Sequence, residues 1–377
     1  MKTAAARGRL AAPGRVNLIG EHIDYHNLAV LPMALDRRVE AEWEALPDAR
    51  VLASSEGFPP REFRLDEPIE AWPPGDWGNY VKAAAAAVQG KWRLRRGADL
   101  RLRSSLPVAA GLSSSTALMT ACTLALLEAN GIQASFEELM EVLPEGEYFV
   151  GTRGGGMDHA AVLGAKEGCA LLVEFAPVRA EPVPVPRGWV FLVADSGVKA
   201  EKSAAVKAEY NERRFAGQRG AEKLGFPGIR AALRAADAEE LRRAAEARLS
   251  GMERRCFLHV IGEAGRVRRA AEAMREGDAA RFGQLLNESH ASLRDLLRVS
   301  CAELDRLAEA AREAGALGAR LTGAGFGGAA VVFCLEEQAP RVEAEIAERY
   351  YGGDAGGRMF RAVPSAGALE LIARGGA

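Results

Sequence analysis

The chain has 377 residues, of which 48% are hydrophobic and 27% charged, and its 49 basic and 51 acidic residues leave a formal net charge of −2. This length suits two lobes better than one core, and the near-neutral charge gives no bulk attraction to nucleic acid or an anionic membrane. The five cysteines are scattered without a CxxC pair and the five histidines are dispersed, which argues against a disulfide framework or a zinc site.

The N-terminal segment MKTAAARGRLAAPGR carries basic residues but lacks the apolar core of a signal peptide. The longest apolar stretch, near Ala117–Leu127, is too short to span a bilayer. We therefore expect a cytoplasmic protein without a membrane or nucleic-acid partner.

Alternating or β-branched runs predict four strands in the first part of the chain, at Val39–Val51, Ala98–Leu102, Ala170–Phe175 and Trp189–Ala194. Apolar positions at helical spacing predict three helices, at Tyr80–Gln89, Ser114–Glu128 and Phe136–Leu143. The proline-rich stretch Pro177–Gly188 is predicted to connect two lobes, because proline lacks a backbone donor and resists helix formation.

The second half of the chain is predominantly helical by its apolar spacing. The predicted helices are Lys202–Leu224, Ala235–Ser250, Arg266–Glu276, Ala279–Asn287 and Glu303–Ala314. A late apolar run, Ala329–Cys334, is predicted to form a buried strand. Strands and helices that come in runs indicate an α+β fold, with an N-terminal lobe at 1–180 and a C-terminal lobe at 188–377.

The first candidate motif is PGRVNLIGEHIDY, at 13–25. Carboxylates at Glu21 and Asp24 are suited to accept hydrogen bonds from sugar hydroxyls, and the planar fork of Arg15 is suited to phosphate or carboxylate. A surface loop with a structural Arg–Glu ion pair is an equally good interpretation of the spacing alone.

The second motif, LPVAAGLSSSTA at 106–117, opens a strongly apolar helix. Small residues let a ligand approach the backbone, and the N–H groups and dipole of a helix start favour an anion. No Gly-Lys-Ser/Thr follows, so this is not a Walker A loop. A simple serine N-cap remains the alternative interpretation.

The third motif, GTRGGGMDH at 151–159, combines a glycine-rich turn with Asp158, which could accept a hydroxyl proton or orient a nucleophile. A flexible turn whose Asp caps the next helix is the alternative. The fourth motif, LTGAGFGG at 321–328, satisfies G-x-G-x-x-G, but a strand is predicted where a dinucleotide fingerprint needs a helix. We therefore interpret it as a glycine-rich loop beside a phosphate or sugar.

Taken in order, these segments resemble the galactokinases, a branch of the GHMP kinase superfamily. GRVNLIGEHIDY resembles the galactokinase signature, LPVAAGLSSSTA the superfamily's ATP-phosphate motif, and LTGAGFGG its third motif. Further matches are Val30–Pro32, Tyr210–Arg214 and Asn287–His290, so the resemblance spans roughly Pro13 to Cys334.

The resemblance implies two α+β lobes with the active site in the cleft between them. It implies transfer of the γ-phosphoryl group of MgATP to the C1 hydroxyl of α-D-galactose. Carried over by position, Asp158 would be the catalytic base with Arg15 beside it. The residues expected to bind the sugar are Glu21, His22, Asp24, Gly155 and Tyr210.

The resemblance also assigns the cofactors, ATP and Mg²⁺. The expected triphosphate contacts are Gly111, Leu112, Ser113, Ser114 and Ser115. Ser115 and Glu147 are the expected magnesium contacts, and Trp77 and Tyr80 lie where relatives contact adenine. Because Arg15 would lower the pKa of Asp158, this carboxylate is expected to orient and stabilise as well as to accept a proton.

Two departures concern the substrate. His26–Ala29 stands where many bacterial relatives carry Asn and glycines, and His159 replaces the usual glutamine. The alternatives are therefore an N-acetylgalactosamine kinase or another galacto-configured sugar 1-kinase, and, in another class, a non-catalytic sugar-sensing regulator. A mevalonate-type kinase is disfavoured because an apolar substrate would have little use for Glu21 and Asp24. The expected partners are the sugar and ATP, with the chain acting as a monomer.

Overall fold

The computed structural model describes residues 7–107, 111–151, 154–199 and 204–375. Its largest sheet has five strands in the order β1-β2-β5-β3-β4. Their bounds are Arg7–Ile19, Leu31–Ala45, Ala98–Ser104, Arg50–Ser55 and Phe58–Arg64. Neighbouring strands run antiparallel except for β3 and β5. The β1–β2 register shifts on either side of Arg15–Asn17, within the first motif.

The single strand predicted at Val39–Val51 is wrong, because β2 ends at Ala45 and β3 begins at Arg50. Pro47 has no backbone N–H to donate to a ladder. Asp48 Oδ1 accepts hydrogen bonds from the backbone nitrogen and Nε of Arg50, at 2.9 and 3.2 Å, which fixes the turn locally.

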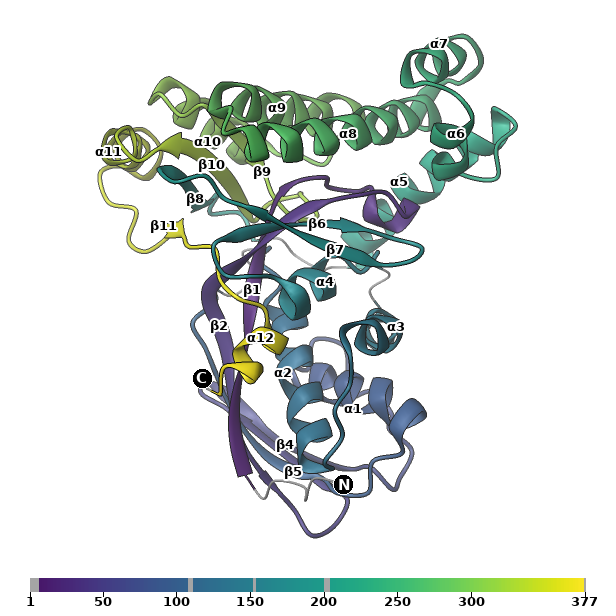
Figure 1. The fold of residues 1–377 in the computed structure, drawn as a ribbon, viewed down its shortest axis with the longest axis vertical. Coiled ribbons are helices and arrows are strands. Elements are labelled where there is room, and N and C mark those ends of the chain that lie inside the picture. The colour runs from purple at the N-terminus through teal and green to yellow at the C-terminus, as the bar shows by residue number, and fades with distance from the viewer. Residues whose placement is uncertain (1–6, 108–110, 152–153, 200–203, 376–377) are drawn as a thin grey trace.

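Helices pack beside this sheet in the lower part of Figure 1. The bounds are α1 Gly78–Trp92, α2 Ser114–Ala129, α3 Phe136–Gly146, the 3₁₀ turn η2 Glu147–Val150, α4 Met157–Gly164 and α12 Ala368–Ala373. Helix α2 is buried on nearly every side and contacts β1, β2 and α1, which explains its almost uninterrupted apolar sequence. The three helices predicted in this half are confirmed, each slightly longer than expected.

A second layer of elements lies above them in Figure 1. It contains a four-stranded sheet in the order β11-β8-β10-β9, with bounds Met359–Ala362, Trp189–Asp195, Ala329–Leu335 and Gly318–Leu321. Its helices are α5 Ala204–Lys223, α6 Ile229–Ala235, α7 Ala238–Arg248, α8 Gly251–Glu276, α9 Ala279–Ser292, α10 Ala302–Glu313 and α11 Ala339–Tyr351, with a π-helical turn η3 at Leu293–Leu297.

Helix α8 begins fifteen residues before the predicted Arg266, because buried Cys256, Phe257, Val260 and Ile261 extend its apolar face. The strand predicted at Ala329–Cys334 is confirmed as β10. No helix of the described ranges is both long and apolar enough to cross a membrane.

The proline-rich stretch at 177–188 is not a plain connection, and this prediction is wrong. Its residues Arg179–Pro184 form β7, which pairs antiparallel with β6, Cys169–Glu174. These two strands form a sheet of their own, so each is an edge strand and prolines can occupy positions that need no donor.

The chain finally returns to the first layer. The Gly367 backbone nitrogen donates to the Ala165 carbonyl at 2.8 Å, and α12 contacts β1 and α4. The lobe boundaries at 180 and 188 stay a prediction, and a division there separates α12 from the elements on which it packs.

Candidate active site

Arg15, Ser113 and Asp158 meet at one point although they come from three separate elements. Arg15 Nε donates to Asp158 Oδ1 at 2.7 Å, across 143 residues of sequence, and Ser113 Oγ donates to Asp158 Oδ2 at 2.5 Å. Arg15 Nη1 also donates to the Gly111 carbonyl at 2.7 Å. The first three motifs therefore converge on one carboxylate.

This convergence determines the charge of Asp158. Burial alone would raise its pKa, but the Arg15 guanidinium and the Ser113 hydroxyl outweigh burial and hold the pKa of Asp158 below its usual value of 3.8. The Arg15 side chain is 6% exposed, whereas that of Asp158 is 29% exposed. Asp158 is thus an ionised carboxylate that a ligand can reach.

The start of α2 is shaped to orient Ser113. This residue precedes the helix with φ 57°, in the left-handed region, and its hydroxyl makes no capping hydrogen bond. The simple N-cap expected as an alternative is therefore wrong for Ser113, because its hydroxyl is donated to Asp158 instead. The first N–H groups of α2 remain available to an anion. Residues 108–110 of this motif lie outside the described part of the chain.

The fourth motif lies against the second. A Cβ added at Gly323, where φ is +84°, would stand 3.1 Å from the Gly111 carbonyl oxygen. The Thr322 side-chain hydroxyl accepts from the Asn17 backbone nitrogen at 3.1 Å and donates to the Asn17 carbonyl at 3.0 Å. The glycine-rich loop after β9 is thereby held against β1 and the start of α2.

Asp24 is packed directly under the glycine turn that precedes α4. Its Oδ1 accepts from the Tyr25 backbone nitrogen at 2.9 Å, and its Oδ2 from the Met157 nitrogen at 3.4 Å. A Cβ on Gly155 would lie 2.5 Å from Asp24 Cγ, so only glycine fits there. Burial and the nearby Asp158 charge raise the pKa of Asp24 to about 6.

His22, Tyr25 and Tyr210 form an aromatic wall beside Asp24. His22 Nε2 lies 3.0 Å from the Ala324 carbonyl and Nδ1 lies 3.0 Å from the Tyr25 hydroxyl. Because a carbonyl only accepts, Nε2 must donate and Nδ1 must accept from Tyr25. Burial lowers the pKa of His22 to about 3, which agrees with a neutral ring. The Tyr210 ring centroid lies 4.9 Å from that of His22.

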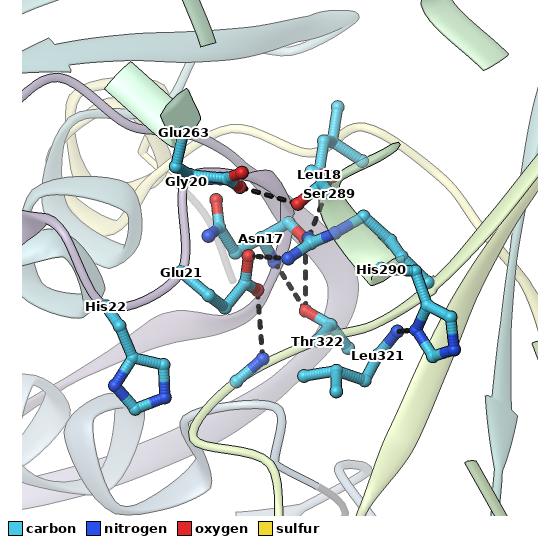
Figure 2. Close-up of polar contacts among 12 residues, drawn as sticks. Asn17, Leu18, Gly20, Glu21, His22, Glu263, Ser289, His290, Leu321 and Thr322 are labelled. Atoms are coloured by element: carbon cyan, nitrogen blue, oxygen red, sulfur yellow. Dashed lines mark hydrogen bonds and ion pairs between the residues drawn. The ribbon is translucent and has the colours of Figure 1, made fainter. Parts of the chain in front are cut away.

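Glu21 is held inside the protein by Arg320. The two side chains form an ion pair through Glu21 Oε2, and Oε1 accepts from the Gly323 backbone nitrogen at 3.0 Å. Arg320 Nη1 also donates to the Asn17 and Leu18 carbonyls, at 3.1 and 2.9 Å. Figure 2 shows Glu21 facing this network while the His22 ring turns away from it. The first motif thus has a structural Arg–Glu pair, but its arginine is Arg320.

Glu263 forms a second buried anchor beneath the same loop. It accepts from the Gly20 backbone nitrogen at 3.1 Å, from Ser289 Oγ at 2.6 Å and from Arg266 Nε at 2.7 Å. Burial by itself would raise its pKa, but Arg266 and other neighbouring cations lower it to about 2. The sequence patterns predicted a role for neither Arg320 nor Glu263. The one signal available was that Arg320 is an arginine inside an otherwise apolar strand.

The residues expected to hold magnesium fit that ion. Thr116 Oγ1 donates to Glu147 Oε1 at 3.0 Å, which places this carboxylate beside the first turn of α2, where Ser115 lies. In the described residues no group of three or more His, Cys, Asp or Glu could hold a metal. A hydroxyl and one carboxylate suit Mg²⁺, which takes its remaining ligands from water and substrate phosphates.

Trp77 and Tyr80 lie at the start of α1. The Trp77 indole donates to the Pro59 carbonyl at 2.9 Å and packs on Phe58, with ring centroids 5.9 Å apart. Helix α1 contacts η2, which carries Glu147. The predicted adenine contacts of these two residues stay a prediction, as do the individual roles of the sugar, phosphate and metal residues.

Known families match three parts of the chain. The galactokinase galactose-binding signature matches residues 3–42, the GHMP kinases N terminal domain residues 79–165, and the GHMP kinases C terminal domain residues 270–352. A mevalonate kinase from L. major, in complex with R-mevalonate, has a similar fold with a TM-score of 0.65 at 21% identity, covering 97% of this chain and 99% of that one. Fold and site together define a kinase of the GHMP class.

Relatives narrow this class. Galactokinase from Streptomyces coelicolor is 35% identical, over 98% of this chain and 95% of its own length. Galactokinase from Thermococcus kodakarensis is 36% identical, over 91% of this chain and 93% of its length. The crystal structure of Lactococcus lactis galactokinase complexed with galactose has a TM-score of 0.86 at 28% identity, over 97% and 95% of the two chains. The chain belongs to the galactokinase family.

Proposed function

We propose that this protein transfers the γ-phosphoryl group of MgATP to the C1 hydroxyl of α-D-galactose. The observation that carries the proposal is the ionised Asp158, held by Arg15 and Ser113 between the helix start of α2 and the Asp24–Gly155 contact. Phosphoryl transfer needs a nucleophilic hydroxyl and a terminal phosphate aligned in such a place. The similarity to a galactokinase that is complexed with galactose supports the choice of sugar.

Asp24, His22 and Tyr210 are proposed to face the sugar hydroxyls. Because His22 and Asp24 are buried, a hydroxyl left without a partner beside them would be costly, which favours a substrate that matches both groups. Gly155 lets the backbone approach the same pocket. Both carboxylate oxygens of Glu21 already have partners, Arg320 and the Gly323 backbone nitrogen. Any contact of Glu21 with the sugar would therefore be made in addition to these two bonds.

The triphosphate is proposed to lie on the residues from Gly111 to Ser115, where α2 offers its first N–H groups. Magnesium, held by Ser115 and Glu147 with the phosphates, would neutralise the charge of the transferred group. Because the pKa of Asp158 is low, this residue is a weak base. We propose that it mainly orients the C1 hydroxyl and accepts its proton late. By then the forming P–O bond has drawn electron density from the attacking oxygen and made its proton acidic.

Asp158→Asn tests this assignment. We expect kcat to fall by about a thousandfold or more while the galactose KM changes little, because the amide keeps the shape but loses the charge. Wild-type turnover in this variant would refute the role of Asp158. A panel of galactose, N-acetylgalactosamine, glucose and mevalonate, with the product phosphate located by NMR, identifies the substrate. Preference for N-acetylgalactosamine would replace the galactose proposal.

We further propose that the protein works in the cytoplasm. All five cysteines are free and three of them are buried, which suits a reducing compartment. The expectation of a monomer stays a prediction, which light scattering coupled to size-exclusion chromatography would check.

A further inference from the structure

A hollow of about 500 Å³ lies outside the Arg15–Asp158 cluster, against the back of the sugar signature. One side of it is the 3₁₀ turn η1, Asp24–His26, with Asn27, and the other sides are α5 and the segment that opens α6. This volume is enough for a small metabolite. The proposed reaction does not use the hollow, although Tyr25 of the aromatic wall beside Asp24 also lines it.

The charged residues that line the hollow are all basic. Arg230 and Arg234 are four residues apart on α6, so they lie on the same face of the helix. Arg230 Nη2 donates to the Ala176 carbonyl at 3.0 Å, whereas Arg234 makes no hydrogen bond or ion pair with the described residues. No Asp or Glu is among the described residues of the lining. Gln218 of the lining donates through Nε2 to Glu222 Oε1 at 2.9 Å, so this neighbouring carboxylate already has a partner.

The histidine of η1 lies between the hollow and α5. His26 is only 8% exposed, and its Nε2 atom is buried without a hydrogen-bond partner among the described residues. Nε2 faces α5 beside Gln218, because a Cβ added at Gly217 would stand 3.3 Å from it. Burial and the charge of Arg214 lower the pKa of His26 to about 3, so the ring is neutral in an electropositive setting. Nε2 therefore points toward α5 and is not open to the hollow, so the two arginines are what makes the hollow suited to an anion.

We propose that this hollow is a second binding site, for a small phosphate-bearing metabolite, which Arg230 and Arg234 contact through their guanidinium groups. Arginine binds phosphate through paired N–H groups, and α6 presents two such forks on one face. The site is distinct from the triphosphate residues at the start of α2.

Calorimetric titration of the whole protein with inorganic phosphate tests the proposal. Galactose and a non-hydrolysable ATP analogue are kept at saturating concentration so that the phosphate positions of the catalytic site are filled. We expect one phosphate bound per chain. In Arg230→Gln/Arg234→Gln this binding should weaken by about tenfold or more, as expected for loss of two charge-assisted contacts.

Arg243→Gln/Arg254→Gln is the matched control, since these exposed arginines lie on α7 and α8 and the net charge changes equally. It should bind phosphate like the wild type. A parallel titration with glycerol 2-phosphate distinguishes a phosphate monoester from the free ion, and binding of either in the hollow supports the site.

The proposal is overturned if neither phosphate nor glycerol 2-phosphate binds the wild type under these conditions. It is equally overturned if the Arg230/Arg234 variant binds as tightly as the control variant. Both arginines lie on α6, outside the Arg15–Asp158 cluster, so these results are independent of the proposed kinase reaction.

Discussion

Replacing Arg320 by methionine tests the buried ion pair that holds Glu21. Arg320 is fully buried and donates to Glu21 and to the carbonyls of Asn17 and Leu18. Methionine fills much of the same volume but leaves the Glu21 carboxylate buried without its cation. Because the charged form of an unpaired buried acid is costly, Arg320→Met should lower the free energy of unfolding substantially.

The magnitude follows from the partners that are lost. Breaking a buried pair from one side costs about 3–5 kcal/mol, and each orphaned carbonyl adds about 1 kcal/mol or more. A total of about 5–7 kcal/mol is a large share of the roughly 5–15 kcal/mol that stabilises a folded domain. Urea unfolding measures this difference, with Arg306→Met, whose side chain is 68% exposed, as control. The control should stay within about 0.5 kcal/mol of wild type.

The double variant Glu21→Gln/Arg320→Met separates charge from packing. Removing the charge of Glu21 should restore part of the stability, so the two substitutions should be strongly non-additive. Burial raises the pKa of Glu21 against the pull of Arg320, so without Arg320 the acid would fold protonated. The deficit of Arg320→Met should therefore shrink as the pH falls. A loss below about 1 kcal/mol, or additive effects, would refute the reasoning.

Four further predictions concern the catalytic site. Gly155→Ala should raise the galactose KM by about tenfold or more, because the new methyl group would lie 2.4 Å from the Tyr25 nitrogen. Steady-state kinetics measure this change. The control is Gly90→Ala, which has open space around its Cβ position. The pH profile of kcat/KM for galactose should fall as the pH drops through about 6, where Asp24 becomes protonated, and a flat profile there would contradict the role of its charge. Because the folded-state pKa of Asp24 is raised, its contribution to stability is present below its usual value of 3.8 and is lost as the pH rises through about 6, so the melting temperature of Asp24→Asn should lack this part of the pH dependence. Ser113→Ala should raise the pKa of Asp158 by removing the hydrogen bond to Oδ2. The decrease of kcat on the acid side of its pH profile should then occur at higher pH. An unchanged profile would mean that Ser113 does not lower the pKa of Asp158.

Local patterns predicted much of this protein because their physical causes are local. The apolar spacing of α2 and α9 marks faces that must be buried, and the glycine-rich segments mark backbone that must turn sharply. The same motifs, read together, were sufficient to recognise the galactokinase family. Local patterns gave a wrong prediction where the position of a strand in its sheet determines the structure. At β7, prolines are tolerated only because β7 is an edge strand.

The sequence alone therefore determined which residue types are present for sugar and phosphate chemistry, and the family they define. The tertiary structure decided which charges meet: Asp158 pairs with Arg15 across 143 residues and Glu21 with Arg320 across 299. Spacing along the chain carries no information about such contacts, because the burial that makes a buried charge require a partner exists only after the distant elements have packed.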